Sequence, residues 1–223
     1  MFNKTLIILA FFNLLSLTTT TASSSYRSIE NESEIENQAP SSATISPYDN
    51  LFRSLSQEHG NDWRLLCAMA YHESRFQPDV VSHCGARGIL QVMPSVARQF
   101  DVTVEQLTNV EDNIDVANRV LSLIEDMLKL PAATSQQDRL KITIAAYNCG
   151  VGRIADARRL AKNFGEDSTS WDVLAKYLQK MDSEEYYNLS VVKYGRFRGA
   201  GQTLAYVRNV VNHYESYCQL AML

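Results

Sequence analysis

Hydrophobic residues along most of the chain recur every three or four positions, which is the period of an amphipathic helix. The longest such stripe runs from Ile114 to Leu128 and ends before Pro131, and the next runs from Leu140 to Tyr147 and ends at Gly150. The alternation that indicates a half-buried strand is nearly absent. The pattern predicts a mostly α single domain. Further helices are expected at residues 47–57, 63–74, 154–164, 171–181 and 201–220, with a short one opening at Pro94.

Helix signals at both ends support these assignments. Asn61-Asp62 can cap the helix that begins at Trp63, because Asn and Asp side chains accept hydrogen bonds from free amides in a first helical turn. After that helix, Pro78, Gly85 and Gly88 indicate a loop with tight turns or a close backbone approach. A long loop is therefore expected between Ser74 and Pro94.

The first part of the 223-residue chain has a different character. Residues 1–25 combine Lys4, an apolar run and a tail of small residues, which predicts a cleaved signal peptide and an exported, periplasmic or envelope-associated protein. The end of that run contains no Cys to which a lipid could be attached. The run is also shorter than a membrane-spanning helix requires. Residues 26–46 are polar and predict a disordered linker, which leaves 47–223 as the domain, without an integral membrane span.

Composition excludes several functions. The formal net charge is −4, and no basic patch suggests nucleic-acid binding. His72, His83, Cys84 and Cys149 match no standard zinc spacing, so we expect no metal and no cofactor. Cys149 also lacks an obvious Cys-His-Asn arrangement that would make it a nucleophile.

The strongest candidate for chemistry is Glu73. Helical spacing places it on the same stripe as Leu66 and Met69, which are apolar. Burial disfavours a charged carboxylate and should raise the pKa of Glu73, and a carboxyl still protonated near neutral pH can act as a general acid. The alternative is a Glu at a helix end that simply extends into solvent.

Three segments give Glu73 a context. Glu73-Ser74, the segment from Gly85 to Pro94 and the segment from Ala146 to Gly150 occur in an order that resembles the soluble lytic transglycosylase (SLT) family. The segment from Tyr186 to Gly199 most resembles the membrane-bound members of that family. The resemblance covers roughly residues 50 to 215. It implies a lysozyme-like, goose-type helical domain with a substrate cleft that acts on peptidoglycan.

In the family, the Glu that matches Glu73 protonates the glycosidic oxygen and then acts as a base. The resemblance implies cleavage between N-acetylmuramic acid and N-acetylglucosamine without water, leaving 1,6-anhydromuramyl ends and needing no second catalytic carboxylate. The nearest aspartates are Asp79, which follows a proline and is better explained as a turn residue, and Asp101. A goose-type hydrolase and a catalytically inactive peptidoglycan-binding module are the alternative functions.

The resemblance also implies substrate-binding residues. Ser82 matches a serine that contacts the substrate acetamido group, and Gln91 and Met93 match residues that line the cleft. Tyr147 matches a tyrosine whose hydroxyl approaches the catalytic Glu, and Asn148 follows it. From residue type alone, Ser82 is an ordinary loop serine, Met93 fits a core as well as a cleft, and Tyr147 fits a buried core stripe.

One departure from the family lies late in the chain. Gln202 stands where many members have Glu, which keeps hydrogen bonding but loses the charge, while Tyr206 matches a tyrosine that supports the cleft wall. Because the resemblance brings the motifs of Cys84 and Cys149 together, it favours a disulfide between them. The protein is expected to be a monomer.

Overall fold

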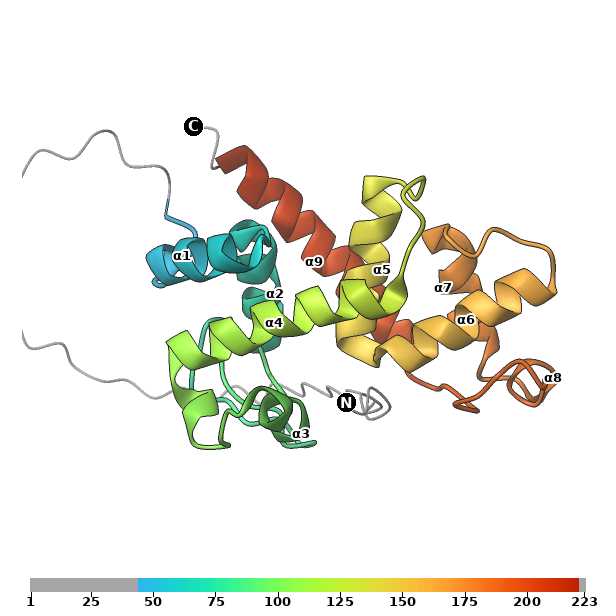
Figure 1. Ribbon diagram of the computed structural model, residues 1–223, viewed down its shortest axis with the longest axis horizontal. Coiled ribbons are helices and arrows are strands. Elements are labelled where there is room, and N and C mark those ends of the chain that lie inside the picture. The colour runs from blue at the N-terminus through green and yellow to red at the C-terminus, as the bar shows by residue number, and fades with distance from the viewer. Residues whose placement is uncertain (1–43, 221–223) are drawn as a thin grey trace, which may run out of the picture.

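The computed structural model describes residues 44–220, and nearly all of its regular structure is helical (Figure 1). The helices are α1 (Asp49–His59), α2 (Trp63–Ser74), α3 (Pro94–Ala97), α4 (Val110–Leu128), α5 (Gln136–Cys149), α6 (Val151–Asn163), α7 (Trp171–Lys180), α8 (Glu184–Tyr187) and α9 (Ala200–Leu220). Two short 3₁₀ helices occupy Arg98–Phe100 and Gln106–Thr108.

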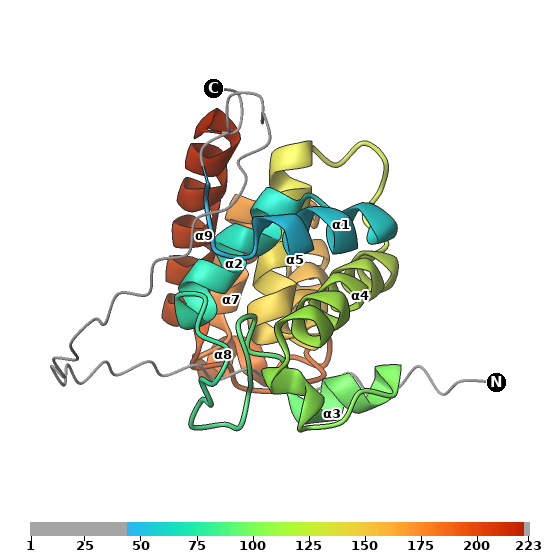
Figure 2. The ribbon, with the colours of Figure 1, turned by 90° about the vertical axis from the view of Figure 1, so that its left-hand side faces the viewer.

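Helix α5 lies at the centre of the domain. Figure 2 shows α9 on one side of it and α4 on the other, and α5 packs against both as well as against α6 and α7. Its last eight residues, from Ile142 to Cys149, are all buried. A helix that is buried on every side at one end provides a fixed support for the elements around it.

Helix α2 crosses between α1 and α9 and carries the candidate acid. Asp62 caps it as expected, because its side chain accepts a hydrogen bond from the Arg64 amide at 3.0 Å. The other Asp62 oxygen accepts a hydrogen bond from the Tyr214 hydroxyl of α9 at 2.8 Å. The start of α2 is therefore fixed both by its own cap and by the C-terminal helix.

The domain begins slightly earlier than residue 47. Ser46 is buried, and its hydroxyl donates a hydrogen bond to the Asp49 carboxylate at 2.6 Å. The amides of Ile45 and Ser46 also donate to Asp49. The last residues of the predicted linker therefore belong to the folded domain. The predicted signal peptide and residues 26–43 of that linker lie outside the described residues.

Most helix boundaries agree with the sequence pattern within two residues, and α2 agrees at both ends. The first helix begins at Asp49 rather than Pro47, because Asp49 caps the preceding backbone with its carboxylate. The pattern did not indicate α8, whose four residues are too few to establish a helical period. In the part of the chain that the structure describes, no helix has the length and hydrophobicity to cross a membrane.

Candidate active site

Glu73 lies in the last turn of α2 and is only 4% exposed. The next residue, Ser74, is also buried, and its hydroxyl donates a hydrogen bond to the Ile89 carbonyl oxygen at 2.9 Å. The same hydroxyl accepts one from the Gln77 amide. The helix end that carries Glu73 is therefore attached directly to the loop that follows, and the alternative of a carboxyl at an exposed helix end does not apply.

Within residues 44–220, Tyr147 and Tyr206 are tyrosines whose pKa is affected by the charge of Glu73. Tyr147 extends from α5, is 3% exposed, and its hydroxyl donates a hydrogen bond to the Leu90 carbonyl oxygen at 2.8 Å. Burial, and then the charge of Glu73, raise the pKa of Tyr147 well above its usual value. Tyr147 thus joins the central helix to the loop and lies within the electrostatic range of the candidate acid.

Tyr206 of α9 is the second tyrosine. Burial, the charges of Glu73 and Tyr147, and hydrogen bonding with the Glu73 carboxyl all raise the pKa of Tyr206 well above its usual value. The hydroxyl is buried and has no hydrogen bond of standard geometry with the described residues, so its interaction with Glu73 is a loose one. Three helices, α2, α5 and α9, therefore contribute one polar group each to a single buried cluster.

The loop between α2 and α3 folds back on itself and contacts this cluster through the Ile89 and Leu90 carbonyl oxygens. Arg87 forms isolated antiparallel bridges with both Val81 and Val92, which turn the chain twice. Gly88 has a φ of +77°, and an added Cβ would lie 2.2 Å from the Leu107 carbonyl oxygen and from the Asn113 side chain. The predicted close backbone approach at Gly88 is therefore confirmed.

Asn113 of α4 explains that close approach. Its side chain is fully buried, accepts a hydrogen bond from the Leu90 amide at 2.9 Å, and donates to the carbonyl oxygens of Arg87 and Leu107. One amide group thus satisfies two backbone groups of this loop and one of the second 3₁₀ helix. Sequence reasoning missed this residue, because an Asn in the first turn of a helix normally indicates a capping role.

Gln91 lies inside the loop. Its side-chain nitrogen donates hydrogen bonds to the Val80 and Gly88 carbonyl oxygens at 3.0 and 2.9 Å, and its backbone has a φ of +48°. The side-chain oxygen is buried and has no hydrogen-bond partner among the described residues. In this conformation the amide nitrogen stabilises the loop, and the buried oxygen is the polar side-chain atom of Gln91 that is left without a protein partner.

The other residues expected to bind substrate occupy different environments. Ser82 is partly exposed, and its hydroxyl accepts a hydrogen bond from the Ala86 amide at 2.9 Å within a tight turn. Met93 is partly buried against the core just before α3. Asn148 is 8% exposed, and its side-chain oxygen accepts a hydrogen bond from the Thr203 hydroxyl at 2.9 Å. Gln202 is exposed at the start of α9.

The expected disulfide is absent. Cys84 and Cys149 are both free thiols, one exposed and one buried. Cys84 lies in the turn between Ser82 and Ala86, on the surface, whereas Cys149 ends the buried part of α5, where burial raises its pKa to about 12. The prediction of this pairing was wrong, because closeness of two motifs does not bring every side chain in them together. Residues 44–220 contain no group of three or more His, Cys, Asp or Glu side chains able to hold a metal ion.

Comparison with known proteins identifies a family that this sequence matches. The family model described as the transglycosylase SLT domain matches residues 50–169. Similar curated proteins are named membrane-bound lytic murein transglycosylase F. The protein from Marinobacter nauticus is 30% identical over 181 residues, which cover 81% of this chain and 34% of that protein. The protein from Maricaulis maris is 36% identical over 165 residues, covering 74% and 34%. The chain thus spans about a third of the length of these relatives.

Solved structures show the same fold. The 70 kDa soluble lytic transglycosylase of Escherichia coli matches with a TM-score of 0.51 and 23% identity, over 76% of this chain and 24% of that chain. An inactive Glu-to-Gln mutant of the lytic transglycosylase Slt of Pseudomonas aeruginosa matches with a TM-score of 0.53 and 21% identity, over 78% and 24%. The predicted mostly helical, lysozyme-like fold is therefore confirmed.

Proposed function

Because the chain belongs to the transglycosylase SLT domain family, we propose that it is a peptidoglycan lytic transglycosylase with Glu73 as its single general acid and base. The observation that carries this proposal is the buried carboxyl of Glu73 between Tyr147 and Tyr206. Burial favours the protonated carboxyl that must donate a proton to a leaving oxygen. The curated relatives are named murein transglycosylases, which supports the same activity.

The proposed reaction needs one carboxyl group. Glu73 donates its proton to the glycosidic oxygen as the bond from that oxygen to C1 of N-acetylmuramic acid breaks. The Glu73 carboxylate then takes the proton of the C6 hydroxyl of the same sugar, and the C6 oxygen bonds to C1. The products are a 1,6-anhydromuramyl end and a free N-acetylglucosamine hydroxyl, and Glu73 is protonated again. Most glycosidases use a pair of carboxylates that flank the scissile bond. Here the nearest aspartates, Asp79 and Asp101, are exposed to solvent, which agrees with a scheme that uses Glu73 alone.

The two tyrosines support opposite protonation states of Glu73. The Tyr147 proton is donated to the Leu90 carbonyl oxygen, so this hydroxyl can offer Glu73 only a lone pair, which favours the protonated acid. The Tyr206 proton has no other acceptor of standard geometry among the described residues and is available to Glu73, which favours the carboxylate. Glu73 must act first as an acid and then as a base, and Tyr147 favours its protonated form while Tyr206 favours its carboxylate.

The test compares purified peptidoglycan digested by the full chain and by its Glu73→Gln variant, with the products identified by mass spectrometry. We expect muropeptides that are one water lighter than hydrolytic products, and none from the variant. Reducing ends would instead indicate a goose-type hydrolase. A folded wild-type chain that binds glycan but releases no product would indicate a binding module and direct attention to Gln202. Peptidoglycan as the substrate supports a location in the cell envelope, and the names of the relatives, membrane-bound lytic murein transglycosylases, support the same location.

A further inference from the structure

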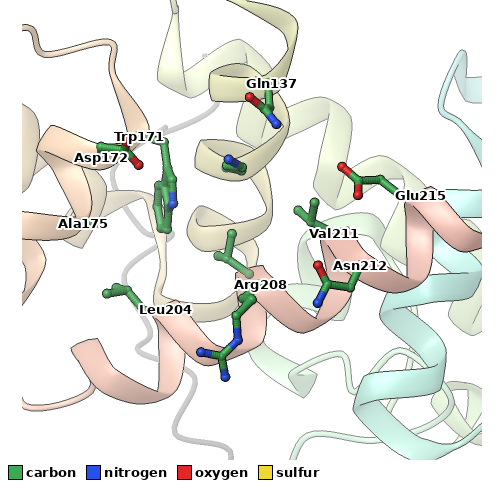
Figure 3. Close-up of a pocket in the computed structure, with 11 residues that line it drawn as sticks. Gln137, Trp171, Asp172, Ala175, Leu204, Arg208, Val211, Asn212 and Glu215 are labelled. Atoms are coloured by element: carbon green, nitrogen blue, oxygen red, sulfur yellow. The ribbon is translucent and has the colours of Figure 1, made fainter.

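A groove with a volume of about 490 Å³ lies between α5, α7 and α9 (Figure 3). Arg208, Val211 and Glu215 line it from α9. Tyr206 and His213, which lie beside His72 of α2, occupy the other side of the same helix. At 100° per residue these two sets of positions are on opposite faces of α9. The groove is therefore separate from the Glu73 cluster.

Apolar side chains form part of the inner surface of this groove. Val207 and Val211 of α9 are buried, and Leu204 extends from the same helix. Trp171 of α7 is only 8% exposed, and Figure 3 shows its indole ring along the wall opposite Glu215 and Asn212. Such a surface can bind methyl and methylene groups of a ligand by excluding water.

Charged side chains of both signs surround the apolar surface. Lys141 and Arg208 carry positive charges, and Asp172 and Glu215 carry negative charges. None of the four forms a salt bridge or a side-chain hydrogen bond with another residue in the described range 44–220. Opposite charges that line one groove without pairing remain available to a ligand that carries both signs itself.

We propose that this groove is a second binding site, for a short peptide that carries free carboxylates and a free ammonium group. Lys141 and Arg208 would bind the carboxylates, and the guanidinium can donate two parallel hydrogen bonds to one of them. Asp172 and Glu215 would bind the ammonium group, and small apolar side chains of the peptide would lie against Trp171. The volume is in the range of about 300–1,000 Å³ typical of small-ligand sites.

This assignment rests on the proposed function for the identity of the ligand, since the peptide stems of peptidoglycan combine carboxylates, an amino group and alanine methyl groups. A neutral glycan chain would leave all four charged side chains of the groove without partners. The charge pattern therefore favours the peptide part of peptidoglycan over its sugars. Binding there would hold the enzyme on a neighbouring stem while a glycan strand occupies the Glu73 site.

Trp171 gives a direct readout, because the chain has two tryptophans and Trp63→Phe leaves Trp171 as the only one. In this full-length background, the free tetrapeptide L-Ala–γ-D-Glu–meso-diaminopimelate–D-Ala should change the fluorescence in a saturable manner. Arg208→Gln should weaken binding roughly tenfold through loss of a charge-assisted contact. Lys162→Gln removes the same charge from an exposed position on α6 outside the groove and should leave the affinity unchanged.

Three results would overturn the proposal. These are no saturable change in Trp171 fluorescence, equal affinities for Arg208→Gln and Lys162→Gln, or binding of neutral chito-oligosaccharide as tight as that of the peptide. Circular dichroism of each variant establishes that it is folded, which is expected because Arg208 is exposed. The titration involves no bond cleavage, so it separates failure of this site from failure of the proposed enzymatic activity, which Glu73→Gln tests.

Discussion

At the scale of single residues, the two tyrosines near Glu73 differ in what their hydroxyls do. Tyr147 donates its proton to a buried backbone carbonyl, so its hydroxyl contributes to folding. Tyr206 has no such bond of standard geometry, and its main polar neighbour is Glu73. Removing the Tyr147 hydroxyl should therefore reduce stability in addition to any effect on Glu73, whereas removing the Tyr206 hydroxyl should act through Glu73 alone.

For Tyr206→Phe we expect a lower turnover with almost unchanged stability. The loss of one donor to the Glu73 carboxylate disfavours the base form, and a shift of one pKa unit corresponds to roughly a tenfold change in the ratio of carboxylate to protonated acid. Unfolding free energy should change little, because the buried hydroxyl forms no hydrogen bond of standard geometry that the substitution would break. Muropeptide release and urea unfolding measure the two quantities, and a large fall in stability with unchanged turnover would contradict the expectation.

Tyr147→Phe should instead destabilise the domain. The Leu90 carbonyl would remain buried without its donor, which costs about 1–3 kcal/mol. The same urea experiment tests this, with Tyr206→Phe as the matched control for loss of one phenol oxygen. If both variants unfold at the same urea concentration as the wild type, the Leu90 hydrogen bond contributes nothing to stability.

At the scale of elements, the loop between α2 and α3 is held by α4 as well as by hydrogen bonds within the loop itself. Asn113 bonds to backbone groups of Arg87, Leu90 and Leu107, and Ser74 bonds to Ile89. These contacts place the loop against the end of α2 that carries Glu73. Disturbing the contact between Gly88 and Asn113 should therefore affect both stability and activity.

Gly88→Ala and Gly85→Ala form a matched pair. Both positions have positive φ, which costs an alanine about 1–2 kcal/mol. At Gly85 an added Cβ meets nothing within 4 Å, whereas at Gly88 it would be 2.2 Å from a backbone oxygen. We expect Gly88→Ala to lose at least about 2 kcal/mol more than Gly85→Ala, because overpacking adds to the strain. Equal thermal unfolding midpoints would show that α4 can move away without cost.

At the scale of the whole molecule, the sequence predicted the features that depend on local signals. The cap at Asp62, the Gly and Pro stops and the apolar stripes are all encoded within a few residues of the helices they define. The Glu73 position follows from the same helical period, and burial confirms it. These predictions succeeded because neighbouring residues alone determine them.

Features formed by distant residues were not predictable in this way. Asn113 contacts a residue 23 positions earlier, and His72 contacts one 141 positions later. The pairing of Cys84 with Cys149 failed for the same reason, since no local pattern reports which thiols face each other. The helices could thus be assigned from sequence, but the contacts that orient the loop and α9 around Glu73 could not.

The contact between α2 and α9 includes a histidine pair next to Glu73. The His72 Nε2 and His213 Nδ1 atoms are 2.9 Å apart. His72 also faces Tyr206 and Tyr71, and the Arg75 guanidinium stacks on Tyr71. Burial, and then the charges of His213 and Arg75, lower the pKa of His72 from 6.5 to about 4. The folded domain therefore resists protonation of this ring.

This low pKa predicts an acid-sensitive domain. Between pH 6.5 and about 4 the unfolded chain binds a proton at His72 that the folded chain does not, so this contribution to stability is full above pH 6.5 and is lost progressively toward pH 4. Urea unfolding across this range should show the decline, and His72→Gln, which cannot titrate, should show a smaller one. The lowered pKa of Asp62 adds a decline at the acid end of this range, but it does so equally in the wild type and in His72→Gln and therefore cancels in their comparison. Because α9 carries Tyr206, muropeptide release should decrease over the same pH range. Identical pH profiles for the wild type and His72→Gln would show that the histidine pair does not control the contact between α2 and α9.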